Sequence, residues 1–598
     1  MNLSPARMLG LSILVLSMLS VGACHESGED VAAVATDFDF DEYLEGFVPE
    51  AITHWTASSP AGTGAPPVDG SMLATPYADA SRWLHYLGDY GGTRHSPLET
   101  LNSDSVSRLE VAWTFGPGVE GQFTVSPIVY GGVMYVTSPH NRLFALDARS
   151  GEILWRYDHQ HADGIRYCGG PASRGAAIHG DRVFMGTLDA RLIAFDRGTG
   201  EIDWNASVAN PEDAFAITSA PLAIGDRVII GVAGAEFGVR AFIDAYDPDT
   251  GERLWRHYTV PAEGEPGSES WAGRSYETGG ASTWAVGAYD AKTDTLFWGT
   301  GNPGPPFSGA MRSGDNLYSN SIIALDARSG ERKWHFQTTP HDIWDWDGNT
   351  QIFLAEVERD GESVDVVIQA NRNGFYYVLD RNSGEYLRGV QYLDKVNWAT
   401  LDENGRPVVE ESAESGAEAV CPGAHGGMNA SWTGAVNPAL GLVYVPAVES
   451  CSIYVRGEVP EGDHIAGLPF LAGTVEFPEA EVAYAHIMAL DLATGERRWD
   501  YREESPTMGG VVSTAGGLLF TGNVAGEVLA LDSATGEPVW SFRVGSSVRS
   551  QPVVYELDGE AYLAIASGGI PIGEAMIVPQ GIVPGSNQLT VFKIPRPL

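Results

Sequence analysis

The stretch Ala145-Leu146-Asp147-Ala148-Arg149-Ser150-Gly151-Glu152-Ile153-Leu154-Trp155 shows a pattern that recurs along the chain. A short apolar segment ends in Asp, a Ser/Thr-Gly-Glu turn follows, and Trp stands four residues after the Gly. Five further copies begin at Asp196, Asp247, Asp326, Asp491 and Asp532. A seventh copy, from Asp380, keeps the turn but has Arg388 in the Trp position. A repeat of this length predicts that each copy is one supersecondary unit.

Each part of the repeat has a physical role. The Asp side chain can hydrogen-bond the backbone of the turn that it opens, and Gly supplies the positive φ of a tight turn. The Trp is then free to pack flat against the next unit. Around the first copy, β-rich runs separated by turn signals predict four antiparallel strands at 126–130, 133–137, 142–146 and 153–157. Four antiparallel strands per repeat predict a blade of a β-propeller.

Both ends of the chain are expected to contribute to one blade. Trp113 has the docking position without matching strands before it, and the late runs 551–555, 561–566 and 589–592 lack a last strand. Joining them closes the ring and removes the sheet edges. The sequence therefore predicts an all-β fold, an eight-bladed β-propeller of four-stranded blades over residues 77–598, with no second folded domain.

The composition restricts the partners of the chain. Its 598 residues include 36 Lys and Arg against 78 Asp and Glu, which gives a formal net charge of −42. A surface of this sign repels nucleic acid, so nucleic acid is excluded as a partner. A soluble basic protein or a cationic ligand suits the charge, and solubility in a salty medium is the alternative explanation.

The first 23 residues predict export. Arg7 precedes the apolar run 8–19, and small residues stand before Cys24, as in a secretory signal. This run is too short to span a bilayer as a helix. The stretch that follows is acidic and rich in Ala, Gly and Pro, so we expect a tether or an extended arm over 24–76.

A lipid anchor is predicted at Cys24. The run Val21-Gly22-Ala23-Cys24 resembles the bacterial lipobox, in which the signal is cut before a Cys that carries lipid. Cleavage of an ordinary signal at Ala23 is the competing interpretation. The residue after Cys24 is His25, not the Asp associated with retention at the inner membrane, which indicates the outer membrane. The protein is thus predicted to be periplasmic and held to a membrane by lipid only.

The stretch Pro340-His341-Asp342-Ile343-Trp344-Asp345-Trp346-Asp347-Gly348-Asn349 has the residue types of a metal or catalytic site. Close carboxylates in a dry pocket raise one another's pKa unless a cation lies between them. A carboxylate beside a bound cation can still act as a general base if one oxygen stays free. The alternative interpretation is a surface turn rich in Asp, with Trp packed beneath it.

Segments between the repeats carry a more specific signal than the repeats themselves. These segments are Gly234-Ala235-Glu236-Phe237-Gly238-Val239-Arg240, Gly279-Gly280-Ala281-Ser282-Thr283-Trp284, Gly299-Thr300-Gly301-Asn302-Pro303 and Asn371-Arg372-Asn373-Gly374. With the repeats, they resemble the quinoprotein alcohol dehydrogenases, eight-bladed propellers of the methanol, ethanol and glucose types that use pyrroloquinoline quinone (PQQ) and a metal ion. The resemblance covers about residues 83–592. Outer-membrane assembly scaffold lipoproteins share only the repeats.

The resemblance implies a metal site built from oxygen ligands, which suit a hard cation. Glu236, Asn302 and Asp345 match the ligand positions of the family. Asp347 is the further candidate, because this position is typically small in the calcium-dependent methanol enzymes and Asp in the lanthanide-dependent ones. Three carboxylates balance a trivalent ion, so a lanthanide is favoured. Calcium is the alternative, since glucose dehydrogenases of the wider superfamily resemble this Trp-Asp-x-Asp pattern without requiring lanthanides.

The resemblance also implies which residues hold the quinone. Trp284 matches the indole that stacks on the ring, and Arg372 matches the basic residue beside the reactive carbonyl. The other implied cofactor contacts are Arg174, Thr218, Gly234, Ala235, Ser282 and Asn429.

The implied activity is oxidation of an alcohol, sugar or aldehyde by hydride transfer to the quinone. The metal acts as a Lewis acid, Asp345 takes the hydroxyl proton, and Arg372 stabilises negative charge on the quinone oxygen. The chain has no Cys-x-x-Cys-His motif, so we expect no c-type haem and a separate electron acceptor such as a cytochrome c. A non-catalytic scaffold that presents loops to partner proteins is the alternative function.

Three departures from the family concern the walls of the quinone site. The family commonly has adjacent cysteines in a small disulfide ring, whereas this chain has Cys168-Gly169. A family Glu in the first blade aligns with Thr124, and an active-site Trp aligns with Met508. The three Cys residues after Cys24 suggest one disulfide with one thiol left over, and the resemblance implies the pair Cys421–Cys451.

Overall fold

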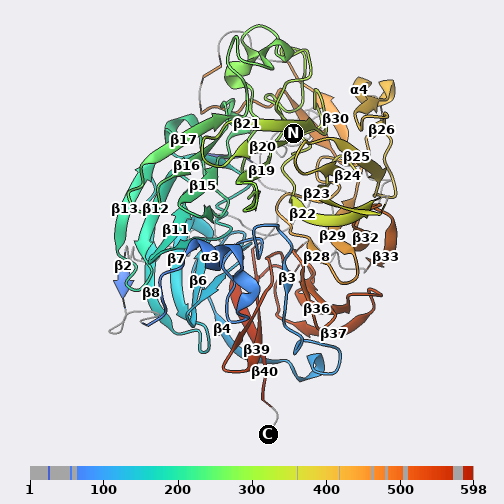
Figure 1. The fold of residues 1–598 in the computed structure, drawn as a ribbon. Coiled ribbons are helices and arrows are strands. Elements are labelled where there is room, and N and C mark those ends of the chain that lie inside the picture. The colour runs from blue at the N-terminus through green and yellow to red at the C-terminus, as the bar shows by residue number, and fades with distance from the viewer. Residues whose placement is uncertain are drawn as a thin grey trace, which may run out of the picture.

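Eight antiparallel sheets of four or five strands stand around a common axis in a computed structural model of the chain (Figure 1). This confirms the predicted eight-bladed β-propeller. The structure describes the backbone of 24–26 and 54–56, and residues 64–596 except 360, 417, 459–463, 466, 479–482, 503–508 and 570–582.

Blades 1 to 4 follow one another along the chain, and their strands pair in sequence order. Blade 1 has β5 (Ile128–Tyr130), β6 (Val133–Ser138), β7 (Arg142–Asp147) and β8 (Ile153–Asp158). Blade 2 has β10 (Ala177–His179), β11 (Arg182–Gly186), β12 (Arg191–Asp196) and β13 (Ile202–Ser207). Blade 3 has β14 (Leu222–Ile224), β15 (Arg227–Gly231), β16 (Phe242–Tyr246) and β17 (Arg253–Tyr258). Blade 4 has β18 (Ala288–Asp290), β19 (Thr295–Gly299), β20 (Ser321–Asp326) and β21 (Arg332–Gln337).

Blades 5 to 7 keep this order, with insertions in and before blade 6. Blade 5 has β22 (Phe353–Arg359), β23 (Glu362–Ala370), β24 (Phe375–Asp380) and β25 (Tyr386–Gln391). Blade 6 has β28 (Ala435–Asn437), β29 (Leu442–Glu449), β32 (Tyr484–Asp491) and β33 (Arg497–Arg502). Blade 7 has β34 (Val512–Thr514), β35 (Leu518–Gly522), β36 (Glu527–Asp532) and β37 (Pro538–Arg543), with β3 (His95–Ser96) parallel to β34.

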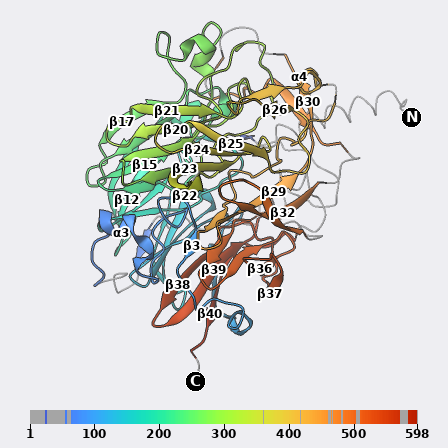
Figure 2. The same ribbon diagram turned by 45° about the vertical axis from the view of Figure 1, so that its right-hand side comes forward.

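The insertions form their own small elements on one side of the ring. They are the hairpin of β26 (Ala399–Leu401) and β27 (Pro407–Val409), the short helix α4 (Glu411–Ser415), and the hairpin of β30 (Ile453–Arg456) and β31 (Gly473–Glu476). Both ribbon views place α4, β26 and β30 together beside blade 5 (Figures 1 and 2). The wide spacings between repeat copies in the sequence correspond to such insertions.

Blade 8 joins the two ends of the chain. Its strands are β38 (Val553–Leu557), β39 (Glu560–Ser567), β40 (Gln588–Ile594) and, as the outermost strand, β4 (Glu110–Phe115). β4 pairs antiparallel with β40, from Glu110 opposite Lys593 to Phe115 opposite Leu589. The ring is therefore closed by backbone hydrogen bonds between its N-terminal and C-terminal parts.

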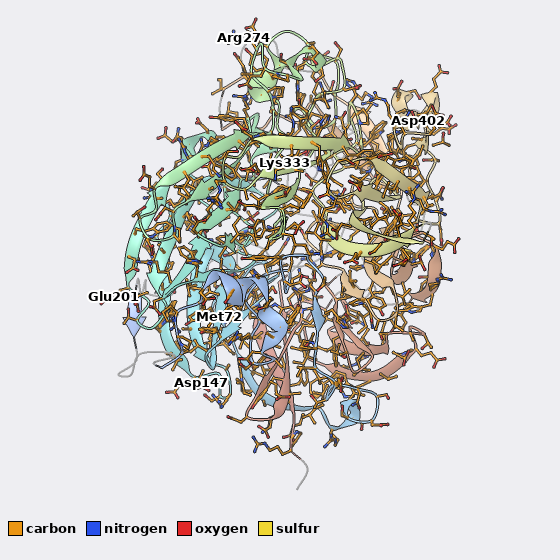
Figure 3. The ribbon with its side chains drawn as sticks, in the orientation of Figure 1. Met72, Asp147, Glu201, Arg274, Lys333 and Asp402 are labelled. Carbon is orange, nitrogen blue, oxygen red and sulfur yellow. A yellow bond between two sulfur atoms is a disulfide. The ribbon has the colours of Figure 1, made fainter. Side chains whose placement is uncertain are left out.

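The repeat turns have the predicted geometry. Asp147 Oδ1 accepts hydrogen bonds from the backbone N of Arg149 (3.0 Å) and Ser150 (2.9 Å), and Gly151 has φ +75°. A Cβ on Gly151 would lie 2.5 Å from the ring of Trp113, so Gly also makes room for the neighbouring Trp. Asp147 and Glu201, from the turns of blades 1 and 2, lie at the outer rim (Figure 3).

The repeat Trp residues connect neighbouring blades. In six of them the indole packs on the Gly of the next turn and its Nε1 donates to a carbonyl oxygen there, whereas Trp540 packs edge-on against Phe592. The pairs are Trp113 with Ala148 (3.3 Å), Trp155 with Arg197 (2.9 Å), Trp204 with Pro248 (3.1 Å), Trp255 with Ala327 (3.1 Å), Trp334 with Arg381 (3.2 Å) and Trp499 with Ser533 (3.2 Å). In the divergent copy, Arg388 Nε donates to Thr494 O instead (2.9 Å).

The segment 83–96 runs across the inner strands before the first repeat. Its backbone hydrogen bonds join Trp83 to Val129, Tyr90 to Tyr289, Gly91 to Leu354, Thr93 to Val436 and Arg94 to Ser513. These partners belong to blades 1, 4, 5, 6 and 7. The buried Arg94 guanidinium also donates to the carbonyl oxygens of Tyr86 and Val511. This segment thus ties the innermost strands of five blades together.

The region expected to be a tether is partly packed. Asp69 caps α3 (Gly70–Ala74), and Val68 and Leu73 are buried. Residues 64–76 therefore pack on the propeller, because their apolar side chains are buried against blades 1 to 3. The strand β2 (His54–Thr56) pairs with β8, and β1 (Cys24–Glu26) pairs with β9 (Arg166–Cys168), as in an extended arm. The predicted signal, 1–23, lies outside the described residues.

The remaining elements are short 3₁₀ helices. They are η1 (Pro76–Ala78), η2 (Val106–Arg108), η3 (Pro139–Asn141), η4 (Pro211–Asp213), η5 (Ala235–Phe237), η6 (Ser268–Ser270) and η7 (Ser275–Thr278). Within the described ranges, no helix is long and apolar enough to cross a membrane. Cys421 and Cys451 form a disulfide, as the resemblance implied, and it ties the segment before β28 to the segment just before β30.

Candidate active site

The candidate site lies in two kinds of loop: those that precede the innermost strands, and those that join the second and third strands of blades 3, 4 and 5. In the stretch 340–349, Asp342 is a structural brace and not a site carboxylate. Its Oδ1 accepts a hydrogen bond from Trp344 N (2.8 Å), and its Oδ2 accepts one from Trp346 N (2.9 Å). The two indoles stack at 4.8 Å between centroids, and both pack on Trp398. The surface-turn interpretation is wrong, because the carboxylates do not lie on the surface: Asp342 is fully buried and the Asp347 side chain is only 13% exposed.

Asp347 is held by two residues that the sequence assigned to the quinone. Its Oδ1 accepts a hydrogen bond from Trp284 Nε1 (3.2 Å), and its Oδ2 forms an ion pair with Arg372 Nη1 (2.9 Å). Arg372 also donates to the backbone carbonyl of Ala424. Burial raises the pKa of Asp347, and the opposing effects of Arg372 and Trp284 do not cancel that rise. These contacts join the loops of blades 4, 5 and 6.

Asp345 and Glu236 lie in the electrostatic field of Asp347. Burial and then the Asp347 charge raise the pKa of Asp345 well above its usual value, although Arg372 opposes this. Burial and Asp347 also raise the pKa of Glu236, to about 7. Both residues keep some accessible surface, yet the surrounding protein removes much of their hydration. The site therefore concentrates three carboxylates that repel one another unless a positive charge is present.

Asn302 provides an observation that tests the predicted metal site. Its side chain is 1% exposed, and its Oδ1 has no hydrogen-bond partner. A buried, unsatisfied carbonyl oxygen is costly, and a hard cation is a suitable partner for it. The residue types fit such a cation. Within the described residues, no group of three His, Cys, Asp or Glu side chains is arranged to hold a metal ion. Asp347 contacts Arg372 and Trp284.

The indole of Trp284 forms one wall of the site. The Arg174 guanidinium carbon lies 4.8 Å from the Trp284 ring centroid. Arg174 Nη1 donates to Thr218 O (3.3 Å), and Nη2 donates to Ser431 Oγ (3.4 Å). Asn429 Oδ1 accepts a hydrogen bond from Ser431 N (2.8 Å). The structure thus brings Arg174, Thr218, Trp284 and Asn429 together from blades 2, 3, 4 and 6.

Two glycines allow the close approach of these loops. A Cβ on Gly301 would lie 2.6 Å from Asp347 Oδ1 and 2.7 Å from Ser282 Oγ. This places Ser282 beside the carboxylate. Gly234 has φ +128°, and a Cβ there would lie 2.7 Å from Ala214 O. This conformation starts η5, in which Ala235 is buried and Glu236 faces the site charges.

Sequence reasoning missed several residues of the site. Ser431 contacts Arg174, and the Ala424 carbonyl accepts a hydrogen bond from Arg372. Two further residues hold Asp342: Asn320 donates to its Oδ2 (2.7 Å), and Arg312 donates to its backbone O (2.6 Å). Ser431 stands two residues after the predicted Asn429, which is the only sequence signal that could have found it. The others act through backbone atoms or from distant loops, which no local pattern records.

The departures from the family are visible in part. Cys168 ends β9 next to Gly169, so a ring of adjacent cysteines cannot form. Thr124 is 3% exposed, and its Oγ1 has no hydrogen-bond partner. Met508 lies outside the described residues.

Comparison with known proteins gives a consistent assignment. The family described as "Glucose/ethanol/alcohol dehydrogenase, beta-propeller domain" matches residues 83–397, and "Outer membrane protein assembly factor BamB" matches only 483–565. Quinoprotein alcohol dehydrogenase PedH of Pseudomonas putida is 38% identical, covering 85% of this chain and 90% of PedH. Quinoprotein ethanol dehydrogenase of Pseudomonas aeruginosa is 35% identical, and the match covers 84% of this chain and 89% of that enzyme. The structure of a europium-containing methanol dehydrogenase superimposes with TM-score 0.81 at 30% identity, covering 87% of this chain and all of that one.

The chain belongs to the family of PQQ-dependent alcohol dehydrogenases, and it is an oxidoreductase that acts on alcohols. Some similar proteins are named quinohemoproteins, among them ADH IIB of Pseudomonas putida at 36% identity. The expectation that this chain has no haem therefore remains a prediction from its missing Cys-x-x-Cys-His motif.

Proposed function

We propose that the protein oxidises an alcohol at PQQ and a single cation held on the propeller axis, with Asp345 as the general base. The observation that carries this proposal is the cluster of mutually repelling carboxylates at Glu236, Asp345 and Asp347, beside Arg372 and Trp284. When bound, the quinone accepts a hydride while the cation polarises its carbonyl.

The residues of the chain have separate roles in the proposed reaction. Asp345 needs its deprotonated form to take the hydroxyl proton of the alcohol, and burial beside Asp347 disfavours that form. A positive charge in the site reverses this effect. Glu236 and Asn302 are the proposed oxygen ligands that hold it. Arg372 presents a fixed guanidinium to negative charge that develops on the cofactor, and Trp284 provides the flat surface for its ring.

We infer that the cation is a lanthanide, with calcium as the alternative. Asp347 adds a third carboxylate, which matches a trivalent charge and overcharges a divalent one. The similarity to a europium-containing methanol dehydrogenase supports this choice. Protein loaded in parallel with calcium and with lanthanum, in the presence of quinone, should be active mainly with lanthanum. Asp347→Ala should reverse that order, whereas full activity with calcium in both proteins contradicts the proposal.

The cellular context is also a proposal. The N-terminal sequence supports export, lipidation at Cys24 and attachment at the periplasmic face of the outer membrane. Electrons then pass to a separate carrier such as a cytochrome c, and the acidic composition suits a basic partner. Mass spectrometry of the exported protein tests the anchor, because a lipidated Cys24 must be the first residue of the mature chain.

Reconstitution tests the activity as a whole. Protein produced without PQQ should reduce an artificial dye with an alcohol only after quinone and metal are both added. A panel of primary alcohols, secondary alcohols, aldehydes and sugars identifies the substrate. Absence of quinone binding and of dye reduction under all loadings rejects the proposed function.

A further inference from the structure

A second, shorter repeat places one unassigned arginine at the candidate site. Three blades begin with the sequences Thr124-Val125-Ser126-Pro127-Ile128, Thr218-Ser219-Ala220-Pro221-Leu222 and Arg549-Ser550-Gln551-Pro552-Val553. In each, Pro directly precedes the first residue of the innermost strand, which is β5, β14 or β38. Arg549 is therefore the counterpart in blade 8 of Thr124 in blade 1 and Thr218 in blade 3.

The same position in other blades belongs to the candidate site. Four residues before the innermost strand stands Trp284 in blade 4 and Ser431 in blade 6. Trp284 bonds Asp347, and Ser431 bonds Arg174. Arg174 itself stands one residue later, three before β10. The residues three or four positions before the innermost strands thus form a ring around the axis. Several of them, on different blades, belong to the candidate site.

Backbone hydrogen bonds show that the blade 8 segment is part of this ring. The bonds run from Gly510 N to Ser550 O (3.0 Å), from Gln551 N to Val125 O (3.2 Å), from Ser126 N to Arg174 O (2.9 Å) and from Arg174 N to Thr218 O (3.1 Å). They link blades 7, 8, 1, 2 and 3 in order. Arg549 consequently lies next to Thr124 along the ring, and Thr124 lies next to the Arg174 segment.

The side chains of the blade 8 segment are buried, and one of them reaches another blade. Gln551 Nε2 reaches from blade 8 to Ser431 O of blade 6 (2.8 Å), the residue that Arg174 contacts from blade 2. Arg549, two residues before Gln551, is 3% exposed. Asn349 stands four residues before β22, at the same position in blade 5. It and Thr124 are buried and have unsatisfied polar atoms, namely Thr124 Oγ1 and both amide atoms of Asn349. Buried polar groups without partners at one level indicate that a polar ligand completes them.

The blade 8 to blade 3 part of the ring favours an anion. Its members are Arg549, Thr124, Arg174 and Thr218, which provide two guanidinium groups and two hydroxyls and no carboxylate. PQQ is a tricarboxylate, and an arginine fork pairs with a carboxylate through two parallel hydrogen bonds. We propose that Arg549, together with the Thr124 hydroxyl, binds a carboxylate of the quinone on the blade 8 side of the axis. This assignment rests on the proposed cofactor.

Quinone affinity tests the assignment without relying on turnover. PQQ titrated into protein produced without it, in the presence of the metal, gives a Kd from fluorescence quenching. Arg549→Ala should raise this Kd about tenfold or more, since it removes a charge-assisted pair. Arg549→Lys should have an intermediate effect, because Lys keeps the charge but loses the fork. Arg543→Ala is the matched control, since that exposed side chain pairs only with Glu527 in the described chain.

A change in the ligand separates direct contact from a structural effect. The trimethyl ester of PQQ carries no carboxylate charge, so wild type and Arg549→Lys should bind it equally well. Thr124→Val removes the proposed hydroxyl donor at nearly constant volume, so it should also weaken binding of PQQ. Wild-type affinity for PQQ in a folded Arg549→Ala or Arg549→Lys variant overturns the assignment. The same loss of affinity for ester and acid also overturns it. Failure of the wild type to bind PQQ rejects the proposed cofactor instead.

Discussion

Two aspartates show how the rim of the propeller differs from its axis. Asp147, in a rim turn, accepts hydrogen bonds from the N of Arg149 and from the N and Oγ of Ser150. Asp345, near the axis, is subject to burial and to the charge of Asp347, which raise its pKa. The rim satisfies its polar groups locally, whereas the axis accumulates carboxylates and unsatisfied atoms. This difference indicates that the rim maintains the ring and that the axis requires a ligand.

The largest effect is expected at the axis. Asp345→Asn preserves the shape of the side chain but removes the base, so the alcohol-dependent rate of the loaded enzyme should fall by about 10²–10⁴-fold. Thermal unfolding should show an intact propeller. Turnover within a few-fold of wild type excludes Asp345 as the base.

At the rim, the expected effect is on stability and not on chemistry. Trp155 is fully buried and its Nε1 donates to Arg197 O, so Trp155→Ala should lower the free energy of unfolding by about 3–5 kcal/mol. Chemical denaturation measures this. Ile202→Ala, at a side chain that is 44% exposed, is the control and should change little. A loss of quinone affinity without a loss of stability in Trp155→Ala contradicts the division between rim and axis.

Removal of the disulfide tests whether the segments around blade 6 depend on a covalent bond for their stability. Its two cysteines are 30 residues apart. The paired variant Cys421→Ser/Cys451→Ser should therefore lose about 3–4 kcal/mol of unfolding free energy, because the unfolded chain gains the entropy of an open loop. Peptide mapping of the native protein provides the direct check, and two unlinked thiols there refute the bond.

The smallest effect concerns a buried histidine in blade 6 that lies between two carboxylates. Burial lowers the pKa of His486, but Asp500 at 2.8 Å and Glu449 at 3.5 Å outweigh it and raise the pKa above 6.5. A raised folded pKa contributes stability below the unfolded pKa, and this stability is lost as pH rises through the folded value. The melting temperature of wild type should therefore exceed that of His486→Asn most below pH 6. A difference that is constant with pH contradicts this.

Much of the fold follows from local sequence. The repeat at Asp147 specifies a turn, a docking site and a strand pair within eleven residues, so eight blades and their order could be predicted. Closure by β4 and β40 was also predictable. The segment of Trp113 had no matching strands before it, and the last three strands of the chain lacked a fourth. The packing of residues 64–76 could not be predicted, because their few apolar residues show no regular spacing. These residues are stabilised only by contact with the assembled blades.

The sequence by itself determined the family, the ring of blades and the types of residue in its loops, because these depend on short-range turn chemistry and on local motifs. The tertiary structure alone decided which of three carboxylates in the stretch 340–349 is a brace and which two enter the site. It also decided that Asp347 meets Arg372 and Trp284, and that the segments of Arg549 and Thr124 are joined by a backbone hydrogen bond. These outcomes depend on contacts between loops that are hundreds of residues apart, and only closure of the ring brings those loops to one axis.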